Sequence, residues 1–133
     1  MIDKQIVTWW ESRWRFLPLV VMLCLVSLLI VLADIDHETL NMSALKRAPM
    51  GDKLAHLVLF GLLALALNTA LKYRQIDGLG KRWQLGSLLV LAFSCLEECS
   101  QLALVSRTFD LTDMLANLIG VSLAHWAGQR MRM

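Results

Sequence analysis

Residues 52–71 read DKLAHLVLFGLLALALNTAL, a stretch that opens with polar residues and continues as an almost unbroken apolar run. A helix of about 20 apolar residues crosses the roughly 30 Å hydrocarbon core of a bilayer, because each residue adds about 1.5 Å. The ionisable residues fall in the first two turns of such a helix. The stretch therefore predicts a transmembrane helix whose ionisable side chains lie near one membrane surface.

The rest of the chain shares this apolar character. Of its 133 residues, 57% are hydrophobic and 18% are charged, and the mean hydropathy is +0.57. Soluble domains of this size are rarely so apolar. Besides the run at residues 54–71, apolar runs of similar length lie at residues 16–33, 85–105 and 111–127. We therefore expect residues 1–133 to form a single all-α domain, a four-helix transmembrane bundle.

Turn signals separate these runs. A Pro-Met-Gly sequence at residues 49–51 breaks the chain before the second run, and Asp52 is a suitable cap for the helix that follows. The sequence Asp-Gly-Leu-Gly at residues 77–80 predicts a turn before the third run. We also expect a short helix at residues 38–46. The first run is long for a signal peptide and has a poor cleavage site, so we expect it to be retained.

Basic residues predict the orientation of the bundle. Nine lie at the two termini or between the second and third runs: Lys4, Arg13, Arg15, Lys72, Arg74, Lys81, Arg82, Arg130 and Arg132. The other four are Lys46, Arg47, Lys53 and Arg107. The positive-inside rule then places both termini in the cytoplasm. These basic residues suit anionic lipid, and we expect no nucleic-acid partner.

Small residues recur at every fourth position of the last run. They are Ala116, Gly120, Ala124 and Gly128. Such a stripe lets another helix approach closely within a membrane. Because Asp113 and Asn117 lie beside the stripe, we expect them to face the bundle rather than lipid.

Nine polar or ionisable residues gather in or beside the apolar runs. They are Asp52, Lys53, His56, Glu98, Gln101, Arg107, Asp110, Asp113 and Asn117. A charged side chain inside the membrane costs about 2.5–3.5 kcal/mol on translocon scales, so such residues are by default a functional-site hypothesis. We therefore expect these nine residues to line a ligand-binding site.

The predicted topology brings this set to one depth. His56, Gln101 and Asp113 lie about 5–6 Å below the outer membrane boundary. Glu98 and Asn117 lie about 10 Å below it. Within each helix the polar residues are three, four or seven positions apart, so each set occupies one face. We therefore expect the histidine, the glutamate and the aspartate to converge in the outer leaflet.

Three motifs in this set resemble those of the VanZ-like family. Residues 52–56, DKLAH, match its D-K-x-x-H, and residues 98–101, ECSQ, match its E-x-x-Q. Residues 107–120, RTFDLTDMLANLIG, match its R-x-x-D-x-x-D-x-x-x-N-x-x-G. The resemblance covers about residues 52–128, and the first run matches only as an apolar segment.

The resemblance implies a small multi-pass protein of the cell envelope, in the bacterial inner membrane. The founding member of the family is associated with resistance to teicoplanin, a glycopeptide that acts at the outer membrane surface. The family resemblance therefore indicates architecture better than biochemical activity. One departure is the extra acid Glu97, although Glu98 keeps the family's spacing to Gln101.

Three functions remain open for the site. The first is a module that binds or handles a lipid-linked envelope component, with the rim cations Lys53 and Arg107 engaging a phosphate. The second is an intramembrane enzyme acting on a lipid head group, with His56, Glu98 and Asp113 as catalytic candidates. The third is a non-catalytic subunit that docks a membrane protein or a second copy of itself. We favour the first, without enzymatic activity.

The acidic balance of the site bears on its ligand. An anionic head group would enter only with protons or a divalent cation. Histidine and carboxylates suit Zn²⁺ or Mn²⁺, but no diagnostic ligand spacing is present, and we assign no cofactor. The plainer interpretation is that Gln101 and Asn117 only join helices, at about 0.6 kcal/mol per hydrogen bond. The cysteines at positions 24, 95 and 99 are expected to be buried and unreactive.

Overall fold

The computed structural model describes residues 13–35, 50–78, 80–103 and 109–131. In chain order, these residues form α2 (Leu17–Ile35), α4 (Gly51–Ala70), β1 (Gln75–Gly78), β2 (Lys81–Gln84), α5 (Leu85–Gln101) and α6 (Leu111–Met131). A helix is therefore present at each of the four predicted runs. The short helix expected at residues 38–46 and the site residue Arg107 lie outside the described residues.

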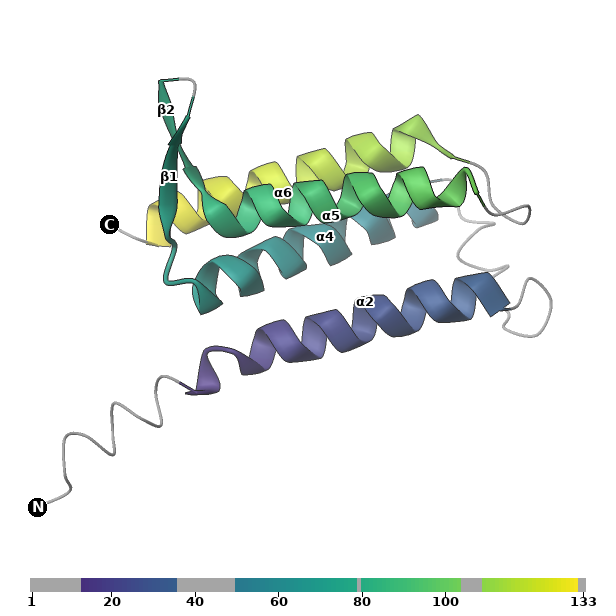
Figure 1. Ribbon diagram of the computed structural model, residues 1–133, viewed down its shortest axis with the longest axis horizontal. Helices are drawn as coiled ribbons and strands as arrows, with labels where there is room; N and C mark the ends of the chain where they lie inside the picture. The colour runs from purple at the N-terminus through teal and green to yellow at the C-terminus, as the bar shows by residue number, and fades with distance from the viewer. Residues whose placement is uncertain (1–12, 36–49, 79, 104–108, 132–133) are drawn as a thin grey trace, which may run out of the picture.

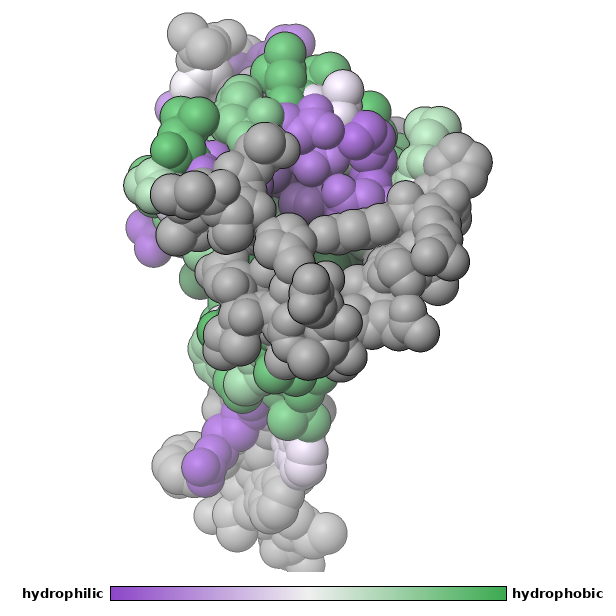
Figure 2. Space-filling view, turned by 90° about the vertical axis from the view of Figure 1, so that its right-hand side faces the viewer, coloured by the Kyte–Doolittle hydropathy of each residue, from purple (hydrophilic) through white to green (hydrophobic). Residues whose placement is uncertain are grey.

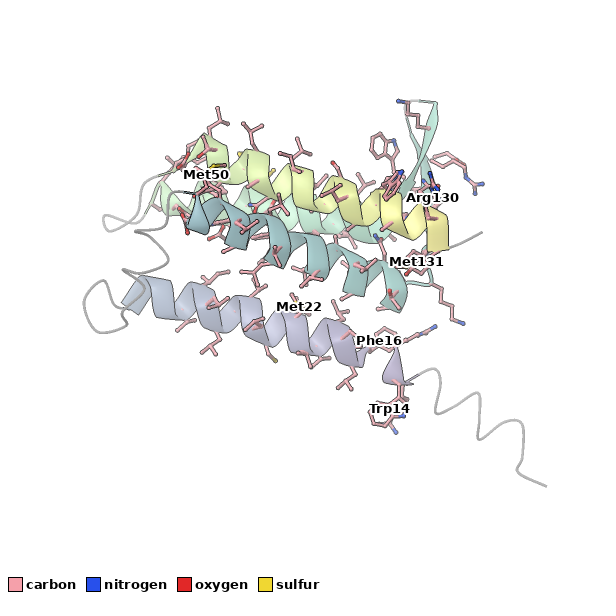
Figure 3. All side chains as sticks on the ribbon, turned by 180° about the vertical axis from the view of Figure 1, so that it is seen from behind. Trp14, Phe16, Met22, Met50, Arg130 and Met131 are labelled. Atoms are coloured by element: carbon pink, nitrogen blue, oxygen red, sulfur yellow. The ribbon has the colours of Figure 1, made fainter. Side chains whose placement is uncertain are left out.

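The helices run alternately in opposite directions (Figure 1). α4, α5 and α6 pack on one another as a three-helix core, and α2 packs on α4. The hairpin, the start of α2 and the end of α6 lie at one end of the bundle. In Figure 3, Phe16 and Arg130 lie at this hairpin end and Met50 lies at the opposite end. The antiparallel arrangement of successive helices is as expected.

A β-hairpin occupies the segment for which the sequence predicts only a turn. β1 and β2 pair antiparallel, and Gly78 lies opposite Lys81 at the tip. Gly80 has a φ of 71°, which glycine adopts without the strain that a Cβ atom would bring. Asp77-Gly78 and Gly80 are residue types that suit a tight hairpin connection. The all-α class is therefore correct for the helices and omits this small sheet.

α4 and α6 approach each other backbone to backbone. A Cβ atom added to Gly61 would lie 3.0 Å from the carbonyl oxygen of Gly120, and one added to Gly120 would overlap the carbonyl of Leu57. Ala116 and Ala124, on the same stripe of α6, are buried as well. The close helix contact expected from the small-residue stripe is therefore confirmed.

Large apolar side chains are abundant on the outside of the bundle. The core consists of a short set of residues: Val26, Phe60, Leu63, Ala64, Val90, Val121 and Ala124. On the outer faces, Leu96, Leu111 and Trp126 are 70%, 61% and 59% exposed. Glu98 and Asn117, in contrast, are fully buried. Such a distribution differs from that of a soluble helical protein, in which leucine is usually inside and glutamate outside.

Length and composition single out α4 as a membrane span. It is the one helix among the described residues that is both long and apolar enough to cross a bilayer. In α2 (19 residues), the part whose side chains are described, Leu17–Val31, is apolar but shorter than a span. α5 ends at Gln101, earlier than expected, and α6 has an aspartate in its first turn and an arginine in its last. Of the four expected membrane spans, length and composition therefore support one, α4.

Two local expectations are wrong. Cys24 and Cys99 are exposed and Cys95 is only partly buried, because they lie on helix faces that point away from the core. Asp52 does not cap α4, since the helix begins one residue earlier, after Met50, and no side chain forms a cap hydrogen bond there. Asp52 lies instead in the first turn, where a negative charge favours the helix dipole.

A buried hydrogen-bond network joins the hairpin to the bundle. Asn68 Nδ2 donates to Gln84 Oε1 at 2.7 Å and to Ser87 Oγ at 2.8 Å, and Asn68 Oδ1 accepts from the Ser87 N–H at 3.1 Å. Gln84 Nε2 donates to the carbonyl of His125 on α6 at 3.2 Å. Asn68 and Gln84 are both 0% exposed. The network therefore holds α4, β2, α5 and α6 together at this end.

The substitution Asn68→Leu should lower the free energy of unfolding, because Gln84 Oε1 and the Ser87 N–H lose their buried partner. Each such group costs about 1–3 kcal/mol when left without a hydrogen bond. Thermal unfolding of the purified protein in detergent measures the loss. Thr69→Val is the matched control, since that hydroxyl donates to the Leu65 carbonyl of its own helix. An equal loss in the two variants would contradict a joining role for Asn68.

Enlarging Gly120 should separate α4 from α6, because any Cβ atom there meets the backbone of Leu57. Overpacking of this kind costs about 1–3 kcal/mol, occasionally more. We expect Gly120→Leu to lower the unfolding temperature in detergent, and Ser122→Leu, on the exposed side of the same helix, to leave it nearly unchanged. A tolerated Gly120→Leu would show that the two helices do not need this close contact.

Candidate functional site

Polar side chains from three helices meet at the end of the bundle opposite the hairpin. Figure 2 looks onto this end and shows hydrophilic side chains gathered among apolar ones. They come from the start of α4 (Asp52, Lys53, His56), the end of α5 (Glu98, Gln101) and the start of α6 (Asp113, Asn117). The close α4–α6 contact begins directly below them, so it determines how near the facing residues come.

His56 lies at the centre of this site. Its Nδ1 is 3.1 Å from Asn117 Oδ1 and 3.9 Å from Glu98 Oε1. Its Nε2 is 3.8 Å from Asp113 Oδ2. The ring stacks on Phe60, with centroids 6.0 Å apart and the planes 3° from parallel. The imidazole of His56 on α4 therefore contacts both α5 and α6 and stacks on the ring of Phe60.

The two adjacent glutamates of α5 point to different partners. Glu98 is 0% exposed and faces His56. Glu97 is partly buried, and its Oε1 accepts a hydrogen bond from Gln101 Nε2 at 3.0 Å. Gln101 thus bonds within its own helix, although it is 6% exposed and lies at the same end as the other site residues.

Lys53 is held between two carboxylates. Its Nζ lies 3.1 Å from Asp110 Oδ2 and 3.2 Å from Asp113 Oδ1. The Asp113 side chain is 10% exposed, and the Asp110 side chain is 41% exposed. The charge of Lys53 is thus balanced on the protein itself, and these contacts use two of the three N–H donors of its ammonium group.

Asp110 precedes α6 and acts as its cap. Its Oδ1 accepts hydrogen bonds from the Thr112 hydroxyl at 2.6 Å and from the Thr112 backbone N–H at 2.8 Å. These two bonds, followed by the bond from Lys53, lower the pKa of Asp110 from 3.8 to about 2. Asp110 is therefore ionised at neutral pH, and it positions the first turn of α6 for the residues that follow.

Asn117 leaves one polar atom of the site available. The residue is 0% exposed, and its Oδ1 faces His56. Within the described parts of the chain, its Nδ2 has no hydrogen-bond partner. A buried N–H without a partner costs about 1–3 kcal/mol. An acceptor atom on a bound ligand would remove that cost.

Two contacts of the site escape the sequence analysis. Phe60 follows His56 by four residues, so the helical spacing alone could have indicated the ring stacking. Thr112 follows Asp110 by two residues, a common pattern for an aspartate that bonds the backbone ahead of it. Asp52, which the sequence did select, is exposed and lies near His56 and Asp113.

A comparison with protein families bears on what this site belongs to. The model of the VanZ/LLP1 family matches residues 7–131, nearly the whole chain. The chain belongs to the VanZ/LLP1 family. No curated protein and no solved structure matches it. In this VanZ/LLP1 chain, the three motifs of the VanZ resemblance are carried by the start of α4, the end of α5 and the start of α6, the segments that meet at the site.

The two ion pairs of Lys53 should differ in strength. Asp113 is more buried than Asp110, so water and salt screen its interaction with Lys53 less. In double-mutant cycles with Lys53→Met, we expect the coupling energy with Asp113→Asn to exceed that with Asp110→Asn. Unfolding in detergent at low and at high salt measures both cycles. A larger coupling with Asp110 would mean that the cap, rather than the site, is the place where Lys53 acts.

Proposed function

We propose that this VanZ/LLP1 protein spans the bacterial inner membrane with four helices and binds the head group of a lipid-linked envelope component at the polar site. One observation carries the proposal: the carboxylates of Glu98 on α5 and Asp113 on α6 each lie within 3.9 Å of the ring of His56 on α4. Ionisable groups inside a membrane are costly, and they commonly mark a ligand or ion pathway.

The surface of the bundle supports a membrane setting. Large apolar residues such as Leu96 and Leu111 are exposed, while the helix contacts use glycine and alanine. Small residues at helix contacts are typical of membrane bundles, because lipid tails offer no hydrophobic advantage to burying leucine. Basic residues in the described chain gather at the hairpin end: Arg13, Arg15, Lys72, Arg74, Lys81, Arg82 and Arg130. By the positive-inside rule that end, with both termini, is cytoplasmic.

The chemistry of the site favours a ligand that donates hydrogen bonds or brings a cation. Glu98 and Asp113 offer carboxylate oxygens near His56, and Lys53 is already balanced by acids. Carboxylates accept hydrogen bonds when ionised and attract ammonium groups or metal ions. Sugar hydroxyls and amino groups of an envelope lipid fit these acceptors. The Asn117 N–H suits one acceptor atom of the same head group.

An enzymatic role has weaker support. A histidine between buried acids resembles a general acid–base pair. However, the hydroxyls of Ser94 and Ser100 donate to the carbonyls of Leu91 and Glu97 in their own helix, rather than to His56. These two hydroxyls are therefore not positioned as nucleophiles that His56 would activate, and binding is the function that we favour.

Native mass spectrometry of the protein purified from membranes in a mild detergent tests the proposal. We expect the wild-type protein to retain a lipid-linked envelope component, and Glu98→Gln to reduce the retained amount at least tenfold, because it replaces the fully buried carboxyl group that faces His56. Asp77→Asn, on the exposed hairpin, is the control and should retain the wild-type amount. Unfolding temperatures of all three proteins show whether the site variant is still folded.

Other outcomes would overturn the binding proposal in different ways. If a lipid-linked envelope component is added to the protein and changes mass, and His56→Ala abolishes this change, the protein is an enzyme. Retention of a partner protein or of a second copy, without lipid, would make it a docking subunit. Loss of stability in Glu98→Gln, with no lipid retained by any of the proteins, would reduce the polar site to a structural role.

A further inference from the structure

We propose that Asp52, His56 and Asp113 bind a divalent metal ion. Asp52 and His56 are one turn apart on α4, and Asp113 faces them from α6. One ligand atom from each lies within 4.8 Å of the other two. A metal ion bound at about 2.1 Å holds its ligand atoms roughly 3–4 Å apart, so small side-chain shifts complete the geometry. Asp52 is exposed and can adjust in this way.

The hydrogen-bond partner of His56 supports this assignment. An amide oxygen can only accept a hydrogen bond, so the tautomer with its proton on Nδ1 donates to Asn117 Oδ1, 3.1 Å away. The Glu98 oxygen at 3.9 Å, on the same side of the ring, favours that proton too. The neutral ring then has its lone pair on Nε2, which is the atom that faces Asp113. Metal-binding histidines usually have their second nitrogen bonded to an oxygen in this way.

The gap between His56 and Asp113 is where a cation fits. Nε2 of the neutral ring and Asp113 Oδ2 are both electron-rich and lie 3.8 Å apart. That separation is too long for a hydrogen bond, and it matches two ligands of one ion. Lys53 does not occupy this gap, because it contacts the other oxygen, Oδ1, of Asp113. Asp113 thus uses Oδ1 to bind the ammonium group of Lys53, and Oδ2 faces the place of the ion.

The ligand set indicates the kind of metal. One imidazole and two carboxylates suit Zn²⁺ or Mn²⁺, and three protein ligands leave at least one position open. A phosphate oxygen of a lipid head group suits such a position. The ion would thus let a site rich in acids hold an anionic head group, and this last step rests on the proposed function.

Metal binding is measured directly on the full chain in detergent. After treatment with a chelator, the protein is titrated with ZnCl₂ or MnCl₂ by calorimetry, and bound metal is counted by elemental analysis. We expect about one ion per chain and a rise in the unfolding temperature. Asp52→Asn and His56→Gln should each weaken binding at least tenfold. Glu97→Gln has the same charge change as Asp52→Asn at the same end of the bundle, so it is the matched control and should bind as the wild type does.

Several results would overturn the metal site. They are the absence of stoichiometric binding by the wild type, or equal weakening by Glu97→Gln and Asp52→Asn. If His56→Gln does not fold, the exposed Asp52→Asn still decides the matter. A third arm adds the chelator to protein that carries co-purified lipid. Release of the lipid supports the ion as its anchor; retention restricts the ion to a separate role and leaves lipid binding intact. Metal binding without any lipid would sink the proposed function alone.

Discussion

The contact between the backbones of α4 and α6 is the constraint on which the site depends. Gly61 and Gly120 leave no room for a Cβ atom between the two helices. One turn above this contact, toward the opposite end from the hairpin, His56 of α4 comes within reach of Asn117 and Asp113 of α6. Short side chains such as aspartate and asparagine meet across helices only when the helix axes are unusually close. The glycine contact between the helices is therefore a condition for the polar residues beside it to meet.

The two ends of the bundle use polar residues differently. At the hairpin end, Asn68, Gln84 and Ser87 are neutral, and they form hydrogen bonds of 2.7–3.1 Å with one another. At the other end most of the polar residues are ionisable, and the distances from His56 to the acids are 3.8 and 3.9 Å. A buried network of neutral groups stabilises a fold when all of its hydrogen bonds are formed. Ionisable groups at longer distances leave space and charge for something else, which is why we place the ligand there.

Much of this architecture is readable from the sequence, because apolar runs and small-residue spacing are local signals. The four helices follow from the runs, and the buried stripe on α6 follows from Gly120 and its neighbours. The preference for Glu98 over Glu97 rests on the family's E-x-x-Q spacing, although Gln101 itself donates to Glu97 in the structure. The hairpin was missed, since its strands are four residues each and depend on Asn68 and Gln84 for anchoring. The double ion pair of Lys53 was missed too, because nothing local links it to an acid 57 residues away.

Because of this separation of 57 residues, Lys53 is synthesised before the acids that it binds. The start of α4 leaves the ribosome well before Asp110 and Asp113 are made, so Lys53 and His56 emerge without the partners that they have in the finished chain. Synthesis of α6 then completes the polar site, because Asp110 and Asp113 come with that last part of the chain.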